Sequence, residues 1–197
     1  VDCMDGSGAL DYRIKPVLTD HPGLVGTAVT CVCGPADNLG LLGALDIAQP
    51  GDIIVASTSG FTGCAVIGDL VLEMMKNKGV IGFITDGLAR DLDGIERVGL
   101  PTFCRGITPN SPARSGPGTA GYPITLDGVH VCSGDAIVTD RDGVVVVPQT
   151  RLAQVTEQLV GIRKAEAVLL AEVQGGMRRP PFYTALVEAG KVAEDNS

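Results

Sequence analysis

The stretch CAVIGDLVLEMMKNKGVIGFITDGLARD, residues 64–91, decides the fold class of this chain. Apolar residues recur at helical spacing through residues 64–78, and Lys78-Gly79 is a typical end for a helix. Residues 80–85 are a short apolar run of the kind that forms a buried strand, and Asp86-Gly87 then opens a loop. A helix that leads into a buried strand and a polar loop is the repeating unit of an α/β protein.

The same alternation continues on both sides of this stretch. Short runs rich in β-branched residues and bounded by Gly or Pro predict further buried strands, and segments with helical spacing lie between them. The middle of the chain is therefore predicted to be an alternating βαβαβ segment. The predicted strands are Leu24–Cys33, Asp52–Thr58, Val80–Thr85 and Pro101–Arg105, and the predicted helices are Asn38–Ala48, Cys64–Lys78 and Asp91–Val98.

The last third of the chain changes character. Residues 108–121 are rich in Gly, Pro, Ser and Thr, which predicts a loop that acts as a lid or a linker. Three short apolar runs follow and are expected to form a meander, and a helix is predicted from Gln149 to about Gln174, followed by a short tail helix. The three runs are Val129–Cys132, Ala136–Thr139 and Val144–Val147, and the tail helix is Thr184–Ala189.

Composition excludes several classes of function. The chain has 197 residues and a net charge of -8, which disfavours binding to nucleic acid and to anionic membranes. No apolar run reaches the roughly 18 to 20 residues that cross a bilayer, so a cytoplasmic location is expected. The six cysteines are expected to be free thiols. Cys31 and Cys33 would share one face of a strand, but no second Cys or His pair at zinc-site spacing accompanies them.

Three residues carry the most informative chemistry. Asp69 lies on the predicted helix of the opening stretch, and Arg90 and Asp91 follow the next strand, so one helix-strand unit can bring them to the same end of the sheet. The fork of Arg suits a carboxylate, whereas Asp offers a hard oxygen for Mg²⁺ or Mn²⁺, and together they could grip a 2-oxo acid. The alternative is a surface turn in which Arg90 pairs with Asp93 or Glu96.

Other mechanisms fit the sequence less well. A Schiff-base aldolase needs a buried lysine, but every lysine lies at a polar helix or loop position. Both histidines are expected to be structural or exposed, and the candidate serines have no accompanying nucleophile elbow. These residues are Lys15, Lys76, Lys78, Lys164 and Lys191, His21 and His130, and Ser57, Ser59 and Ser111.

The order of motifs resembles the RraA-like family, which contains metal-dependent 4-hydroxy-4-methyl-2-oxoglutarate and 4-carboxy-4-hydroxy-2-oxoadipate aldolases and the regulator of ribonuclease activity A. The resemblance implies one layered β/β/α domain of the swivelling type over residues 1–197, with a central mixed sheet flanked by helices. It also implies a homotrimer or homohexamer in which residues 149–197 pack on a neighbouring subunit. The motifs are Val25–Thr30, Pro50–Val55, Gly68–Gly106, Gly134-Asp135 and Asp142–Pro148.

The resemblance also implies roles for individual residues. Arg90 would hold the pyruvate part of the substrate and stabilise its enolate, while Asp91 would bind a divalent metal, Mg²⁺ or Mn²⁺, directly. Asp69 would bind the metal through water and polarise the water that acts as base. The backbone of Gly68, Asp69, Leu70 and Val71 would seat the substrate carboxylate, and Glu166, or alternatively Glu172, would reach the metal of a neighbouring subunit through water.

The implied activity is a class II aldolase that releases pyruvate from a 4-hydroxy-2-oxo dicarboxylic or tricarboxylic acid. Oxaloacetate decarboxylation is expected as a side activity, because it passes through the same enolate. One position departs from the family pattern: Gly94 stands where an acidic residue is expected, with Asp93 beside it as a replacement. This departure motivates the alternative of a regulatory binding protein without catalysis, similar to the regulator of ribonuclease activity A.

Overall fold

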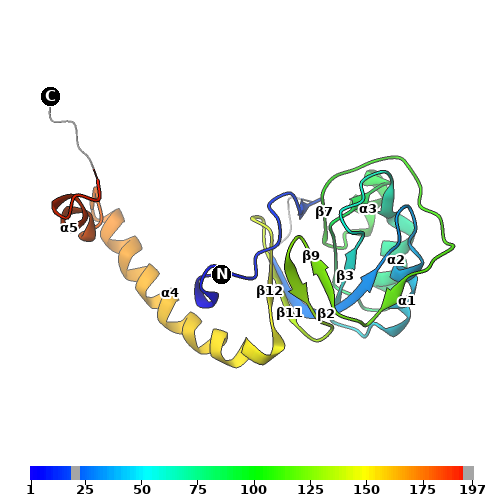
Figure 1. Ribbon diagram of the computed structural model, residues 1–197, viewed down its shortest axis with the longest axis horizontal. Coiled ribbons are helices and arrows are strands. Elements are labelled where there is room, and N and C mark those ends of the chain that lie inside the picture. Colours follow the sequence, from blue (N-terminus) through cyan, green and yellow to red (C-terminus); the bar gives the residue numbers. More distant parts are fainter. Residues whose placement is uncertain (19–22, 193–197) are drawn as a thin grey trace. The chain divides into compact units, whose positions relative to one another are not determined.

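The structure is a computed structural model in which residues 1–18 and 23–192 are described. The chain forms two compact units, Val1–Val155 and Thr156–Ser197 (Figure 1). The first unit contains β1 Lys15–Pro16, β2 Leu24–Val32, α1 Leu39–Ile47, β3 Asp52–Ser57, β4 Ala65–Ile67, α2 Asp69–Asn77, β5 Gly82–Thr85, β6 Leu88–Ala89, α3 Leu92–Val98, β7 Thr102–Cys104, β8 Thr119–Ala120, β9 Ile124–Leu126, β10 Val129–Val131, β11 Ala136–Thr139 and β12 Val144–Val147.

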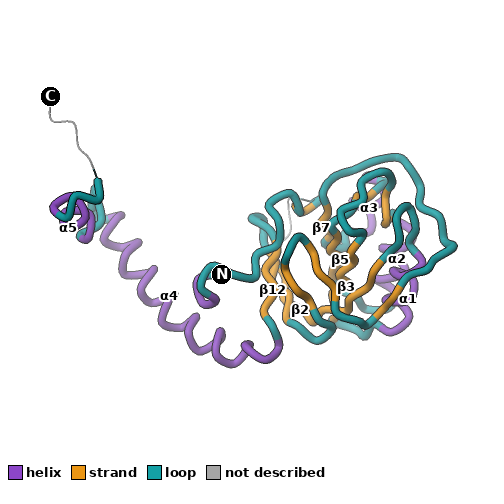
Figure 2. Tube along the Cα trace, viewed as in Figure 1, coloured by secondary structure: helices purple, strands orange, loops and turns teal. Residues whose placement is uncertain are grey.

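The first unit is built on one mixed sheet with the strand order β1-β7-β5-β3-β2-β11-β12, to which β8 adds by pairing with β2. Strands β2, β3, β5 and β7 are parallel neighbours, because helices α1, α2 and α3 return the chain between them. The hairpin of β11 and β12 extends the sheet antiparallel to β2. Two small strand pairs lie outside the main sheet (Figure 2). The pair β4-β6 is parallel, and the pair β9-β10 is antiparallel.

Both faces of the sheet are covered, as the continuous apolar runs of its central strands require. On one face, Ile54 and Ala56 of β3 pack in a cluster with residues of α1, α2 and α3. On the other face, Ile53 and Val55 pack with Phe103 of β7 and with residues of β9 and β10. The predicted α/β class with layers of helix, sheet and second β layer is therefore confirmed.

The predicted elements mostly match, with two corrections. Residues 65–67 form β4 rather than the first turn of a helix, because they pair with Leu88–Ala89, and the helix begins only at Asp69. The three late strands do not form one meander, because β10 pairs with β9 in its own sheet while β11 and β12 join the main one. The Gly-rich and Pro-rich loop is confirmed up to β8.

The C-terminal helices are α4 Leu152–Gln174 and α5 Phe182–Glu188, which follow a 3-10 turn at Gln149–Arg151. Neither α4 nor α5 has a buried residue. The expectation that residues 149–197 pack on a neighbouring subunit remains a prediction. Among the described residues, no helix combines the length and the apolar character needed to span a membrane.

Candidate active site

The short parallel pair of β4 and β6 places Gly68 beside Arg90. Ile67 aligns with Ala89, and the backbone N–H of Arg90 donates to the carbonyl of Ile67 at 3.0 Å. A Cβ atom on Gly68 would lie 2.5 Å from Oδ2 of Asp91 and 3.2 Å from Nε of Arg90. Only glycine therefore lets both side chains lie against the start of α2.

Arg90 and Asp91 form an ion pair, with Nε of Arg90 3.2 Å from Oδ2 of Asp91. The surface-turn alternative, in which Arg90 pairs with Asp93 or Glu96, does not match this geometry. Asp91 precedes α3 in the left-handed conformation (φ 65°) without capping the helix through its side chain. Such a backbone costs about 1 to 3 kcal/mol in a residue other than glycine, and this kind of strain is concentrated at functional sites. The carboxylate of Asp91 is therefore not used to cap α3 and lies beside Arg90 instead.

Asp69 meets α3 at Gly94. Its Oδ1 accepts a hydrogen bond from the N–H of Leu70 at 2.8 Å, and its Oδ2 lies 3.7 Å from Nη2 of Arg97. A Cβ atom on Gly94 would lie 2.5 Å from Cβ and 2.6 Å from Cγ of Asp69. Glycine at position 94, the departure from the expected pattern, is therefore what makes room for Asp69 between the two helices.

Two hollows adjoin at these residues. Asp69, Leu70, Arg90 and Asp91 line both of them. The first hollow continues to Asn38, Val66, Ile67, Gly68, Val71, Pro112 and Arg114, and the second continues to Leu92, Asp93, Gly94 and Arg97. The structure thus brings together the predicted residues of the first unit, and the pair of Arg90 and Asp91 faces open space.

The donor set of the second hollow suits a hard divalent cation. Within residues 1–18 and 23–192, no group of three or more His, Cys, Asp and Glu side chains is arranged to hold a metal. The carboxylates of Asp69 and Asp91 nevertheless line the same hollow. Mg²⁺ is commonly bound through one or two carboxylates, with water and substrate completing its coordination. These residues therefore fit Mg²⁺ or Mn²⁺.

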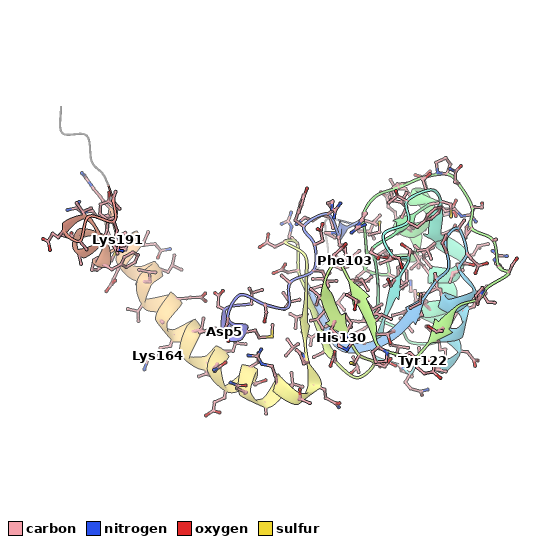
Figure 3. All side chains as sticks on the ribbon, in the orientation of Figure 1. Asp5, Phe103, Tyr122, His130, Lys164 and Lys191 are labelled. Atoms are coloured by element: carbon pink, nitrogen blue, oxygen red, sulfur yellow. The ribbon has the colours of Figure 1, made fainter. Side chains whose placement is uncertain are left out.

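The remaining predicted residues have other surroundings. Glu166 and Glu172 are exposed on α4 and belong to the second unit, so their role as metal-site residues remains a prediction. His21 lies outside the described residues. His130 is exposed on β10, where its Nε2 lies 3.4 Å from Sγ of Cys132 (Figure 3).

The cysteines show no sign of a soft-metal site. None of the six is in a disulfide, and Cys31 and Cys33 are buried in the core. A hydrogen bond between their thiols, together with burial, raises the pKa of Cys31, whereas the same hydrogen bond lowers the pKa of Cys33. Burial raises the pKa of Cys104. Cys31, Cys33 and Cys104 are therefore buried members of the core.

Sequence reasoning missed a set of residues at the start of α1. The carboxylate of Asp37 accepts hydrogen bonds from the backbone N–H groups of Leu39 at 2.7 Å, Ser115 at 2.6 Å and Gly116 at 2.9 Å. These hydrogen bonds lower the pKa of Asp37. Asp37 thereby ties the loop after β7 to α1. The Asp-Asn pair before the predicted helix could have indicated that these residues organise the helix start, because both residue types favour that position.

The same loop reaches Arg90. Nη1 of Arg90 donates a hydrogen bond to Oγ of Ser111. Asn38, next to Asp37, donates from Nδ2 to the carbonyl of Val66 at 3.2 Å, and its Oδ1 is buried without a hydrogen-bond partner among the described residues. Asn38, Ser111 and Arg114 therefore belong to the site, and apart from the Asp-Asn pair before α1 no motif in the sequence marks them.

Comparison with known proteins finds a matching family model and several relatives. A sequence model of the RraA-like family, described as Aldolase/RraA, matches residues 1–146. The chain is 40% identical over 148 residues to a protein of Halalkalibacterium halodurans named "Putative 4-hydroxy-4-methyl-2-oxoglutarate aldolase", which covers 75% of this chain and 70% of that protein.

Two solved structures are similar over most of their length. An uncharacterized protein from Pseudomonas syringae has a TM-score of 0.74 and 28% identity, covering 89% of this chain and 84% of its own. RraAS2 of Streptomyces coelicolor, described as an unusual member of the RNase ES inhibitor RraA protein family, has a TM-score of 0.74 and 27% identity, covering 86% of this chain and 88% of its own. One of these relatives is thus named as an aldolase and another as a member of an inhibitor family.

Proposed function

Because this chain belongs to the RraA-like family, we propose that it is a divalent-metal-dependent lyase that cleaves 4-hydroxy-2-oxo acids with release of pyruvate. The observation that carries this proposal is the meeting of Arg90, Asp91 and Asp69 at two adjoining hollows. The similarity to a protein with an aldolase name supports the same reaction class.

The residues divide the work as follows. Arg90 binds the 2-oxo acid through its guanidinium and stabilises the negative charge that develops on the keto oxygen when the bond between C3 and C4 breaks. The first turn of α2, from Gly68 to Val71, presents backbone N–H groups that make no backbone hydrogen bond within the helix, and these groups seat the substrate carboxylate. The N–H of Leu70 joins them only when it exchanges Oδ1 of Asp69 for the substrate.

The carboxylates supply the other half of the site. Asp91 would hold Mg²⁺ or Mn²⁺ directly, and Asp69 would hold it through water, with Glu166 of a neighbouring subunit as a further contributor. A divalent cation bound there supplies Lewis-acid stabilisation of the charge on the substrate oxygens. Asp69 also orients the base that accepts the proton of the 4-hydroxyl group. Oxaloacetate loses CO₂ through the same enolate, so slow decarboxylation is part of the proposal.

Pyruvate release from 4-hydroxy-4-methyl-2-oxoglutarate, coupled to lactate dehydrogenase, tests this function. We expect turnover with Mg²⁺ or Mn²⁺, loss of turnover with EDTA, and recovery when the metal is restored. Arg90→Ala and Asp91→Asn are expected to lower kcat at least a hundredfold. Arg141→Gln, at an exposed arginine of the β11-β12 turn, is the matched control. Turnover that persists in EDTA or in Arg90→Ala would contradict the proposal.

The competing function is regulatory binding of another protein without catalysis, which the similarity to RraAS2 favours. A regulator of this kind would use its surface rather than the hollows at Arg90. Absence of lyase and decarboxylase activity in the wild type, together with capture of a specific protein partner that Arg90→Ala does not weaken, would decide for this function.

A further inference from the structure

A hydrogen bond links the candidate catalytic arginine to a serine that the proposed chemistry does not use. Nη1 of Arg90 donates to Oγ of Ser111, which lies 21 positions further along the chain. The hydroxyl of Ser111 makes no other hydrogen bond with the described residues. Ser111 has no nucleophile elbow around it, so a role as nucleophile does not account for this contact. Its hydroxyl is instead an acceptor for the guanidinium.

The backbone holds Ser111 in place from both sides. Before it, the carbonyl of Asn110 accepts a hydrogen bond from the N–H of Ala65 at 3.0 Å, which ties the loop to the start of β4. After it, the N–H of Ala113 donates to the carbonyl of Ala36 at 2.7 Å, which ties the loop to the chain before α1. Because both anchors lie close to Ser111 in the chain, its hydroxyl is a fixed acceptor beside Arg90.

Asp91 alone is a poor anchor for the guanidinium. Nε of Arg90 lies 3.2 Å from Oδ2 of Asp91, and the side chain of Arg90 is 28% exposed. In the proposed function the carboxylate of Asp91 also serves a divalent cation, so its oxygens are shared between that cation and Nε. Ser111 is uncharged and has no such second task, so its contact with Nη1 can persist in the loaded site. A long side chain such as Arg loses much rotamer freedom when it is held, which makes a second anchor useful.

These two contacts leave one nitrogen of the guanidinium free. Nε faces Asp91 and Nη1 faces Ser111, whereas Nη2 of Arg90 has no partner among the described residues. The guanidinium is planar and rigid, so two held nitrogens fix the direction of the third. Arg90 lines both hollows. Donors that are oriented before the reaction stabilise developing charge without rearranging during it.

We propose that Ser111 is a positioning residue that holds Nη1 of Arg90, so that the free donors of the guanidinium are oriented in advance toward the keto oxygen on which the enolate charge develops. This inference rests on the proposed function, since it takes the pyruvate half of the substrate to lie at Arg90. Ser111 then acts through Arg90 and contributes more to the enolate than to the bound substrate.

Three variants test this role in the pyruvate-release assay. Ser111→Ala removes the acceptor and Ser111→Thr keeps a hydroxyl. Ser115→Ala is the matched control, because Ser115 is an exposed serine of the same loop whose hydroxyl makes no hydrogen bond with a described residue. We expect Ser111→Ala to lower kcat about fivefold to twentyfold and to change KM less than about twofold, as for a hydrogen bond to a charged group that matters in the transition state. Ser111→Thr should recover kcat to within about threefold of the wild type.

Binding provides a readout that does not depend on turnover. Oxalate imitates the pyruvate enolate, and calorimetry with Mg²⁺ in excess compares it with pyruvate. Ser111→Ala should weaken oxalate about fivefold or more and pyruvate less than about twofold. Arg90→Ala should also weaken oxalate, and Ser111→Ala added to Arg90→Ala should weaken it no further, because the two residues act as a unit.

The guanidinium itself can be followed by NMR without metal or ligand. Rotation of the Arg90 group about the Nε–Cζ bond should be slow in the wild type and in Ser115→Ala, and faster in Ser111→Ala. The Arg90 signals are assigned from their loss in Arg90→Lys.

The inference is wrong if Ser111→Ala keeps the kcat of the Ser115→Ala control, if Ser111→Thr behaves as Ser111→Ala does, or if the guanidinium rotates equally fast with and without the hydroxyl. Equal weakening of oxalate and pyruvate would assign Ser111 to the structure of the loop instead. Further weakening of oxalate in the Arg90→Ala background would mean that Ser111 acts independently of Arg90. If the wild type releases no pyruvate and binds no oxalate, the proposed function fails and this inference fails with it, whereas full turnover in Ser111→Ala refutes the inference alone.

Discussion

Substitution of Gly94 by alanine should damage the site through packing alone. The added Cβ atom would lie 2.5 Å from Cβ and 2.6 Å from Cγ of Asp69, whereas carbon atoms pack at about 3.5 to 4.0 Å. Rotation of the carboxylate cannot relieve this overlap, because the Cβ atom of Asp69 is fixed to the backbone of α2. Helix α3 must therefore move away from α2, or Asp69 must leave its position.

The expected magnitude follows from two opposing effects. Overpacking in a well-packed region costs about 1 to 3 kcal/mol, while alanine in place of glycine within a helix gains about 1 kcal/mol. The net loss in the free energy of unfolding is thus about 1 kcal/mol, or about 2 to 4 °C in Tm. Displacement of Asp69 should in addition weaken Mg²⁺ binding or turnover about 10- to 100-fold, as is usual when a residue that supports a metal site is lost.

Differential scanning calorimetry and Mg²⁺ titration of pyruvate release measure these effects. Gly161→Ala is the matched control, because Gly161 also lies inside a helix, α4, and an added Cβ would meet nothing within 4 Å. The control should keep or raise Tm by the ordinary gain in helix propensity and leave metal affinity unchanged. The reasoning would be refuted if Gly94→Ala raised Tm as the control does, or if it left the Mg²⁺ dependence unaltered.

Further predictions concern the groups that shape the loops around the site. Asp37→Asn should lower stability at neutral pH, and because the pKa of Asp37 is lowered in the folded state, urea titrations should show the difference shrinking as pH falls below about 4. Asp86→Ala should cost about 2 to 4 kcal/mol in urea unfolding, more than Asp86→Asn, because the N–H groups of Thr58 and Gly60 lose their acceptor. A thiol reagent should modify Cys132 first, since the other cysteines are buried, and Cys132→Ser should abolish the fast phase.

The central strands were predictable because their residues carry a strong local signal. Strand β3 is a run of β-branched and small apolar residues that is buried on both faces, and the predicted bounds match within a residue. The failure at residues 64–68 has a physical cause: β4 is apolar, as the first turn of a buried helix would be, and its partner β6 spans only Leu88–Ala89. A strand pair this short is defined by tertiary contacts, which no local pattern reports. Strand β9, Ile124–Leu126, was missed for the same reason.

The site residues likewise fall into two groups, those that the sequence reveals and those that only the fold brings together. Asp69, Arg90 and Asp91 were identified because one helix-strand unit brings them to the same end of the sheet and because the order of motifs resembles the RraA-like family; spacing alone left the surface turn open. Asn38 and Arg114 are far from this unit in sequence and meet it only through the fold. The unpaired oxygen of Asn38 can be recognised only when each of its neighbours is known.

Recognition of a dianionic substrate by a chain of net charge -8 requires local positive potential. The starts of α1 and α2, at Asn38 and Gly68, both line the first hollow, and helix N-termini favour negative charge. The guanidinium of Arg90 is mostly buried there, whereas Arg114 is exposed, so salt should screen Arg114 more strongly. In calorimetric titrations with Mg²⁺, raising NaCl from about 0.05 to 0.5 M should therefore weaken the binding of the dicarboxylate 2-oxoglutarate more than that of 2-oxopentanoate, a monocarboxylate of the same chain length. Equal weakening of both acids by salt would mean that a single electrostatic site, at Arg90, reads the whole substrate.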